Sequence, residues 1–325
     1  LYALIALPLF IVMGLIMNES GITSRLIDFS LLFVRKVRGG LGLVNVIASM
    51  IFGGISGSSA SDTASIGSVM IPEMEKRGYP KRFAAGITVA SSTMGMIIPP
   101  SIPMVLYAIV AEESVGKLFL GGLIPGVMIG LFQLGLTLAV SKRRNYPMED
   151  IQLTGADVIN RVRRSVFALI MPNFIVGSIV FGIATVTESA AMGVIYAFAI
   201  GLFFLHGINR KIFLTKKLGD CFRQAILTSA KIMIIIAFSK LYIWILALER
   251  IPEKVAGLVI LMELSPVTML ILIVLIILIA GTFIDVSPAI LLLTPVFLPA
   301  CVAVGISPIQ FGAVLITGCL LYTSP

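Results

Sequence analysis

Several long stretches of this chain contain no Asp, Glu, Lys or Arg. They cover residues 1–17, 83–110, 118–140, 166–184, 190–205 and 267–281. A helix needs about 20 apolar residues to cross the hydrocarbon core of a bilayer, so some stretches can cross and others are too short. With 58% hydrophobic and 12% charged residues, the chain resembles membrane proteins in composition. We therefore predict an all-α polytopic membrane protein, because a helix forms the hydrogen bonds of its backbone N–H and C=O groups internally, as lipid requires.

The basic residues indicate which loops face the cytoplasm. Most of the 24 Lys and Arg gather in four segments, at residues 35–38, 76–82, 142–164 and 210–217. Lys and Arg accumulate in cytoplasmic loops, so we expect these segments on one side. The net charge of +8 then reflects topology and contact with the lipid bilayer, and we expect no nucleic-acid partner for so apolar a chain.

Residues 41–72 begin and end beside basic segments, so they are expected to enter and leave the membrane on the same side. Their middle, at residues 52–68, reads FGGISGSSASDTASIGS. A helix, a polar break and a second helix would form a re-entrant hairpin over residues 41–74, with its tip part-way through the bilayer. Backbone without helical hydrogen bonds is tolerated at that depth only where it lines a cavity.

This polar stretch is rich in oxygen atoms. Its central residues are Gly54, Ser56, Gly57, Ser58 and Ser59. Glycine lets the backbone turn and approach closely, while hydroxyls and freed carbonyls supply neutral oxygens for a hard cation such as Na⁺. The N-terminus of the following helix suits a carboxylate. Asp62 could cap that helix or face an ion, and we predict that it is a cap.

Residues 83–110 contain another polar break, SSTMGMIIPPS, at residues 91–101. Pro99 and Pro100 remove two backbone donors, and Gly95 loosens the helix further. We predict that this unwound piece, with Ser92 and Thr93, faces the hairpin tip and lends oxygens to the same ion. A proline kink that serves packing is the alternative.

The C-terminal part repeats this pattern. VTMLILIVLIILIAG is followed by TFIDVSP and then AILLLTPVFLPACVAV, with both apolar arms too short to cross. The corresponding landmarks are Pro72 with Pro299, Gly78 with Gly305, Pro80 with Pro308, and Phe83 with Phe311. The loop EKRGYPKR is strongly basic, whereas residues 300–311 carry no charge, which predicts opposite sides of the membrane. Inverted repeats with broken helices are typical of secondary transporters.

Isolated charges also occur near or within the apolar segments. We predict that Asp285 is a site residue, because acids within the membrane are costly and usually functional. Glu188 is either a helix-start residue, with Thr187 as the cap, or a functional acid. Lys231 and Lys240 are expected to extend along their helix to the membrane interface.

In its motifs the chain resembles the large membrane subunit of tripartite ATP-independent periplasmic (TRAP) transporters. The matching stretches are VNVIASMIFGGISGSSASDTASIGSVMIPEM, GMIIPPS, FGIATVTESAAMGVIYA and GTFIDVSPAILLLTPVFLP. The resemblance implies sodium-coupled uptake of an organic acid, such as a C4-dicarboxylate, sialic acid or a related carboxylate, by an elevator mechanism. It also implies a bacterial inner membrane, a small membrane subunit and a periplasmic solute-binding protein. It implies neither enzyme activity nor a cofactor. The ion coupled to transport is expected to be Na⁺.

The resemblance also maps the family's functional segments onto this chain. The first hairpin tip falls on residues 54–59, its unwound partner on 95–100 and the second tip on 281–285; we call these the first tip, the break and the second tip. The residues so implied to bind Na⁺ are Ser56, Ser58, Gly95, Gly281 and Asp285. The chain departs from the family at residues 185–188. It also departs at residues 319–325, where the resemblance implies a Pro-Pro-containing break as the partner of the second tip.

These inferences divide the chain into parts. Residues 1–40 form scaffold spans and a connecting helix, and 41–140 form the first repeat, with hairpin 41–74, broken span 83–110 and span 118–140. Residues 141–164 form a cytoplasmic loop, 165–250 scaffold spans and an arm helix, and 251–325 the second hairpin (about 266–304) and a truncated span. We take the chain, which begins at Leu1, as a fragment without its N-terminal spans.

Other functions share parts of this pattern. A sodium–dicarboxylate symporter that works without a binding protein uses similar hairpins and is the main alternative. An intramembrane serine protease could use Ser56 in a G-x-S-G pattern, but its base would have to be His206, at the cytoplasmic end of a span. A channel would need a ring of charges or a repeated filter. Cys221, Cys301 and Cys319 are too scattered for a disulfide framework or a metal site.

Overall fold

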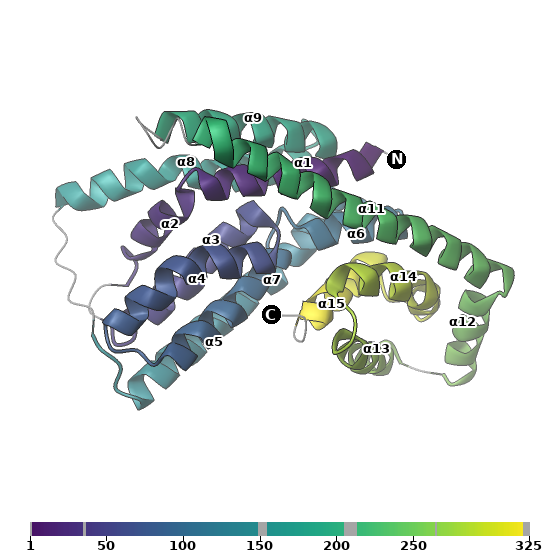
Figure 1. Ribbon diagram of the computed structural model, residues 1–325. Helices are drawn as coiled ribbons and strands as arrows, with labels where there is room; N and C mark the ends of the chain where they lie inside the picture. Colours follow the sequence, from purple (N-terminus) through teal and green to yellow (C-terminus); the bar gives the residue numbers. More distant parts are fainter. Residues whose placement is uncertain (1, 35–36, 149–154, 205–212, 264, 321–325) are drawn as a thin grey trace.

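The computed structural model describes residues 2–34, 37–148, 155–204, 213–263 and 265–320, and this part of the chain is nearly all helical (Figure 1). The elements are α1 (Tyr2–Glu19), α2 (Ile22–Ser30), α3 (Gly40–Ser56), α4 (Ser59–Lys76), α5 (Lys81–Ser92), the 3₁₀ helix η1 (Thr93–Met96), α6 (Ile102–Ala111), α7 (Val115–Arg143), α8 (Gly155–Val180), α9 (Val186–Phe204), the π-helix η2 (Phe213–Lys217), α11 (Leu218–Leu248), α12 (Ile251–Leu261), α13 (Pro266–Gly281), α14 (Val286–Ala303) and α15 (Pro308–Leu320).

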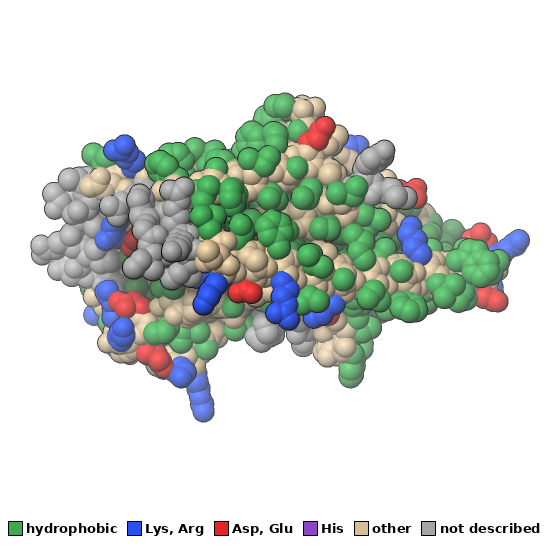
Figure 2. All heavy atoms as spheres, turned by 45° about the horizontal axis from the view of Figure 1, so that its top comes forward, with side chains coloured by type: hydrophobic (Ala, Val, Ile, Leu, Met, Phe, Trp, Pro, Cys, Tyr) green, Lys and Arg blue, Asp and Glu red, His purple; other side chains and the backbone are tan. Residues whose placement is uncertain are grey.

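Five helices in the described ranges are long and apolar enough to cross a membrane. They are Val115–Arg143, Val158–Val180, Val186–Phe203, Phe213–Leu248 and Val286–Ala303. Helices α1 and α2 meet the same criterion as a pair bent by 72°. Large apolar side chains project outward from these spans, as Phe132 (74% exposed) and Phe238 (70%) do, and Figure 2 shows hydrophobic side chains over much of one face. The prediction of an all-α protein with several membrane-spanning helices is confirmed.

Helices α3 and α4 form a tight pair, separated only by Gly57 and Ser58. Helix α3 ends there because Gly57 takes a left-handed backbone conformation (φ 61°), and its N–H donates to the Gly53 carbonyl at 3.0 Å. Buried polar contacts join α3 to α5, where Asn45 Nδ2 donates to Thr88 Oγ1 at 2.7 Å. That this pair re-enters the membrane from one side stays a prediction.

Helices α13 and α14 form a second pair, joined by residues 282–285, and α15 packs against both. Asp285 begins α14 as its N-cap, with the Val286 N–H donating to Asp285 Oδ1 at 2.8 Å. Tyr107, on α6, links this group to the first one. Its hydroxyl donates to the Pro308 carbonyl at 2.6 Å, and its ring lies 6.1 Å from that of Phe311.

Helices α1, α8, α9 and α11 lie along one side of these two groups, whereas α7 packs against α3 and α15 (Figure 1). Helix α1 packs against α9 and α11, and α8 packs against α2 and α9. Helix α11 extends from α1, past the two pairs, to α12, and it also contacts α14. The arrangement places α11 beside the second pair, while the division into repeats and scaffold stays a prediction.

Candidate ion and substrate site

The break in the span after the first pair lies directly against the first tip. Helix α5 ends at Ser92, the 3₁₀ turn η1 follows, and α6 starts at Ile102, so residues 97–101 are outside any helix. A Cβ built on Gly54 would lie 3.0 Å from the Pro99 carbonyl oxygen, and one on Gly57 would lie 3.1 Å from that of Pro100. The backbones of the first tip and the break are therefore in direct contact, which only glycine permits at these positions.

Asp62 lies at the centre of this contact. Its side chain is fully buried, and the Ser56 hydroxyl donates to Asp62 Oδ1. Its other oxygen, Oδ2, has no hydrogen-bond partner among the described residues. A Cβ built on Gly95 would collide with Asp62 Oδ2, and one on Gly53 would lie 3.4 Å from it. The orphaned carboxylate oxygen therefore points between the first tip and the break.

The predicted capping role of Asp62 is wrong. Ser58 is the N-cap of α4, and no side chain caps this helix. Asp62 is the fourth residue of α4, one turn beyond the cap, so its carboxylate faces inward toward Gly95 instead of the free N–H groups.

Two of the predicted site residues bond within their own helix. Ser92 Oγ donates to the Thr88 carbonyl at 2.7 Å, and Thr93 Oγ1 donates to the Ala90 carbonyl at 2.8 Å. Such back-bonds occupy the hydroxyl proton and leave oxygen lone pairs. The predicted role of Ser92 and Thr93 in ion binding stays a prediction.

Residues of both tips line a cavity of about 420 Å³. It is lined by Ser58 and Ser59 at the first tip, by Asp285 at the second tip, by Val286 and Ser287 at the start of α14, and by residues of α6 and α11. The N-termini of α4 and α14 both open into it, and a helix N-terminus presents free N–H groups and a partial positive charge. The structure thus brings the two predicted tips to one cavity.

The second tip differs from the first in its surroundings. Gly281 ends α13 and is buried, but it does not line the cavity. Helix α15 packs against α13 and α14 and is described to Leu320, so the non-matching residues 321–325 lie outside the described part. A second ion site at Gly281 and Asp285 stays a prediction.

Glu188 is explained by a contact at the start of α9. The Thr185 N–H and Oγ1 both donate to Glu188 Oε2 at 2.8 Å, and the Glu188 N–H donates to Thr185 Oγ1 at 3.3 Å. This is a capping box, so the helix-start interpretation of Glu188 holds, with Thr185 as the cap in place of Thr187.

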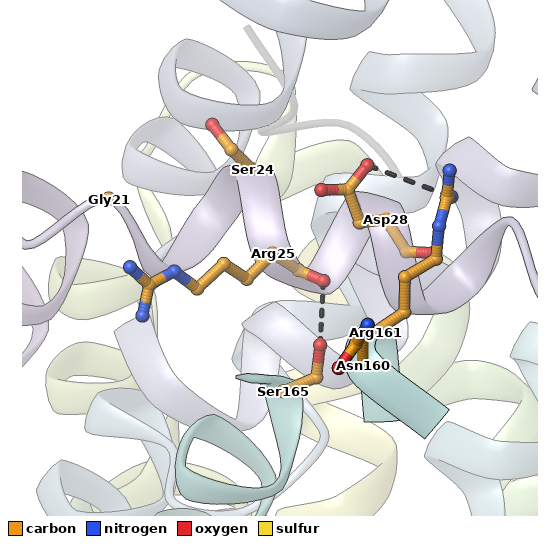
Figure 3. A pocket seen from close by; sticks show the side chains of 7 residues that line it. All are labelled: Gly21, Ser24, Arg25, Asp28, Asn160, Arg161 and Ser165. Carbon is orange, nitrogen blue, oxygen red and sulfur yellow. Dashed lines mark hydrogen bonds and ion pairs between the residues drawn. The ribbon is translucent and has the colours of Figure 1, made fainter. Parts of the chain in front are cut away.

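A separate cavity of about 480 Å³ lies between α2 and α8, away from both tips (Figure 3). Arg161 reaches toward Asp28, with 3.9 Å between Arg161 Nη1 and Asp28 Oδ1, and Ser165 Oγ donates to the Arg25 carbonyl at 2.9 Å. These contacts hold α2 against α8.

The described residues contain no cluster of three or more His, Cys, Asp or Glu that could hold a metal ion. A cation at the first tip would have to bind to Asp62, hydroxyls and backbone carbonyls. That donor set suits a hard monovalent ion better than a transition metal. The histidine that a protease would need, His206, lies outside the described residues.

The family model of the tripartite ATP-independent periplasmic transporter DctM component matches residues 1–323. The chain belongs to the DctM family. It is therefore part of a multi-pass permease subunit and not an enzyme, which confirms the predicted family and the predicted lack of enzyme activity.

Curated relatives of this DctM chain are named for different organic acids. It is 36% identical over 320 residues to the C4-dicarboxylate TRAP transporter large permease protein DctM of Pseudomonas aeruginosa, covering 97% of the chain and 72% of that relative. It is 32% identical to the sialic acid large permease protein SiaM of Vibrio cholerae, covering 98% and 74%. It is 33% identical to the isethionate permease protein DctMQ of Oleidesulfovibrio alaskensis, covering 97% of the chain and 49% of that longer relative.

Proposed function

We propose that this chain carries out the transport step of a TRAP transporter, which couples Na⁺ entry to uptake of an organic acid across a bacterial inner membrane. The observation that carries the proposal is the buried Asp62 carboxylate, whose Oδ2 has no partner among the described residues and faces Gly53 and Gly95. A buried ionised carboxylate is costly unless a cation or hydrogen bonds compensate it. A Na⁺ ion held by Asp62, the Ser56 hydroxyl and nearby carbonyls supplies that compensation.

The organic acid binds in the cavity between the two tips. The N-terminus of α4, which has no side-chain cap, opens into this cavity and favours a carboxylate or sulfonate. Binding of Na⁺ behind the first tip fixes the orientation of Ser58 and Ser59, which line the cavity. Ion and substrate are therefore coupled through one short segment of backbone.

The transport step is an elevator motion. The break contacts α3 and α4, while α6, which follows the break, packs against α14 and α15 and is joined to α15 by the Tyr107–Pro308 hydrogen bond. We treat the two helix pairs, the break, α6 and α15 as one unit. We assign this unit to the moving part and α1, α8, α9 and α11 to the scaffold. A small membrane subunit and a periplasmic solute-binding protein complete the transporter, as in other TRAP systems.

Uptake by the complete transporter tests this function. The full-length chain, its small subunit and its binding protein are reconstituted in proteoliposomes with radiolabelled succinate, N-acetylneuraminate or isethionate. We expect uptake of at least one acid with an inward Na⁺ gradient, and none when K⁺ replaces Na⁺ or when the binding protein is omitted. Equal uptake without the binding protein would favour the symporter alternative, and no Na⁺-dependent uptake of any of these acids would contradict the proposal.

The predicted inverted orientation of the two pairs can be tested by cysteine labelling. The native Cys221, Cys301 and Cys319 are buried, so a cysteine introduced at an exposed loop can be labelled selectively. We expect Lys76→Cys to react with a membrane-impermeant maleimide only from the cytoplasmic side, and Ala303→Cys only from the periplasmic side. The reason is that basic residues follow the first pair and none follow the second. Labelling of both from the cytoplasm would end the inverted-repeat interpretation.

A further inference from the structure

Lys231 lies near the middle of the longest apolar helix. Helix α11 runs from Leu218 to Leu248, which puts Lys231 13 residues after its start (231 − 218) and 17 before its end (248 − 231). At about 1.5 Å per residue, these separations are about 20 Å and 26 Å. A lysine side chain is too short to reach either end of α11, and the predicted extension of Lys231 to the membrane interface stays a prediction.

The side chain of Lys231 faces the cavity between the tips. Thr228, Lys231, Ile232 and Ile235 line that cavity. They follow the i, i+3, i+4, i+7 spacing of one helix face. Lys240, nine residues further along, is rotated by about 180° around the helix and does not line the cavity. Two lysines of one helix therefore have different surroundings.

Lys231 has no ion-pair partner among the described residues around the cavity. Among the described lining residues, Lys231 is the one base and Asp285 the one acid. Asp285 accepts a hydrogen bond from the Val286 N–H at the start of its own helix, and none of the ion pairs in the described ranges includes Lys231. Lys231 and the N-terminus of α4 therefore form a positive part of the cavity wall that favours an anionic group, and Asp285 places the one negative charge of the described lining at the second tip.

We infer that Lys231 is a substrate-binding residue, whose ammonium group pairs with the carboxylate or sulfonate of the transported acid. This inference rests on the proposed function of the cavity. An ionisable residue within the membrane usually marks a substrate or ion pathway. Because Lys231 belongs to α11 and the tips belong to the two helix pairs, the bound acid bridges α11 and the moving unit.

Three variants of the complete transporter test this role. Lys231→Gln is expected to raise the KM for the transported acid by roughly tenfold or more, because it removes the one basic side chain among the described residues that line the cavity. Measured at saturating acid, the Na⁺ concentration for half-maximal uptake should stay within about twofold of wild type, since Asp62 is untouched. Lys231→Arg should recover much of the affinity because it restores the charge. Lys240→Gln is the matched control and should resemble wild type in both measurements.

The outcomes separate this inference from the proposed function. If wild type shows Na⁺-driven uptake and Lys231→Gln has the same KM as Lys240→Gln, Lys231 does not bind the acid and the inference is wrong. If Lys231→Gln changes KM and Na⁺ dependence together and Lys231→Arg does not recover either, the role of Lys231 is structural. If wild type takes up none of succinate, N-acetylneuraminate and isethionate, the proposed function itself fails, and the inference with it.

Discussion

Replacement of Asp62 by Asn should remove most of the sodium dependence of uptake while the chain still folds. Asn has the same shape as Asp and can still accept the hydrogen bond that the Ser56 hydroxyl donates. It carries no charge to hold a cation in a buried place. Removal of one partner of a buried ion pair costs about 3–5 kcal/mol, which corresponds to a roughly 100-fold or greater loss of Na⁺ affinity. Uptake by reconstituted transporter, measured over a range of Na⁺ concentrations, gives this affinity.

Asp220→Asn is the control for this substitution. Asp220 is exposed in the first turn of α11, where its interaction with the helix dipole contributes about 0.3–1 kcal/mol. We expect it to leave the Na⁺ dependence of uptake unchanged. If Asp62→Asn and Asp220→Asn have the same half-maximal Na⁺ concentration, then Asp62 is not an ion ligand.

The second large effect on Na⁺ affinity is expected from Gly95→Ala, which adds a single methyl group at the break. In Gly95→Ala the new Cβ would collide with Asp62 Oδ2 and lie 3.1 Å from both Asp62 Cγ and the Gly53 Cα. The carboxylate or the break must move, so we expect at least a tenfold loss of Na⁺ affinity, on the order of 1.4 kcal/mol. Crowding of this kind also typically lowers the free energy of unfolding by about 1–3 kcal/mol.

Gly86→Ala is the matched control for Gly95→Ala. Gly86 lies in α5, and a Cβ there would meet no atom within 4 Å outside its own helix. Alanine is favoured over glycine within a helix by about 0.5–1 kcal/mol, so this variant should unfold at the same or a higher temperature. Thermal unfolding in detergent and the Na⁺ titration are measured for both. Identical behaviour of the two variants would mean that the break does not press on Asp62.

The sequence predicted the helices and their interruptions because glycine and proline act locally. Glycine takes the left-handed conformation that Gly57 has without steric cost, and Pro99 and Pro100 cannot donate backbone hydrogen bonds in any fold. The contact between the first tip and the break was expected from two polar segments in an apolar chain, since such segments are satisfied best by one another.

The direction of Asp62 could not be predicted in the same way. An acid near a helix start is usually a cap, and the face of α4 that turns toward Gly95 depends on how α4 packs against α5 and η1. One signal was present, because an acid within an apolar segment is usually functional. The capping box of α9 was also readable, since residues 185–188 read TVTE, which has Thr and Glu three positions apart.

Lys231 shows a second limit of reasoning from sequence. The spacing of Lys231 and Lys240 places them on opposite faces of α11, but the sequence does not say which face meets another element. That depends on the path of α11 from α1 to α12, which brings its middle to the cavity between the tips (Figure 1).

Direct binding of sodium tests the central claim, that Asp62 and the first tip hold a Na⁺ ion. Radioactive Na⁺ is equilibrated with the purified full-length chain in detergent, without substrate or partner proteins, and competed with unlabelled Na⁺ or K⁺. The account predicts saturable binding that Na⁺ displaces and K⁺ does not. Asp62→Asn should lose the binding at the first tip and so bind fewer Na⁺ ions per chain than wild type, whereas Asp220→Asn should bind as many as wild type. Binding of as many Na⁺ ions per chain in Asp62→Asn as in wild type, or no saturable binding in the wild-type chain, would contradict it.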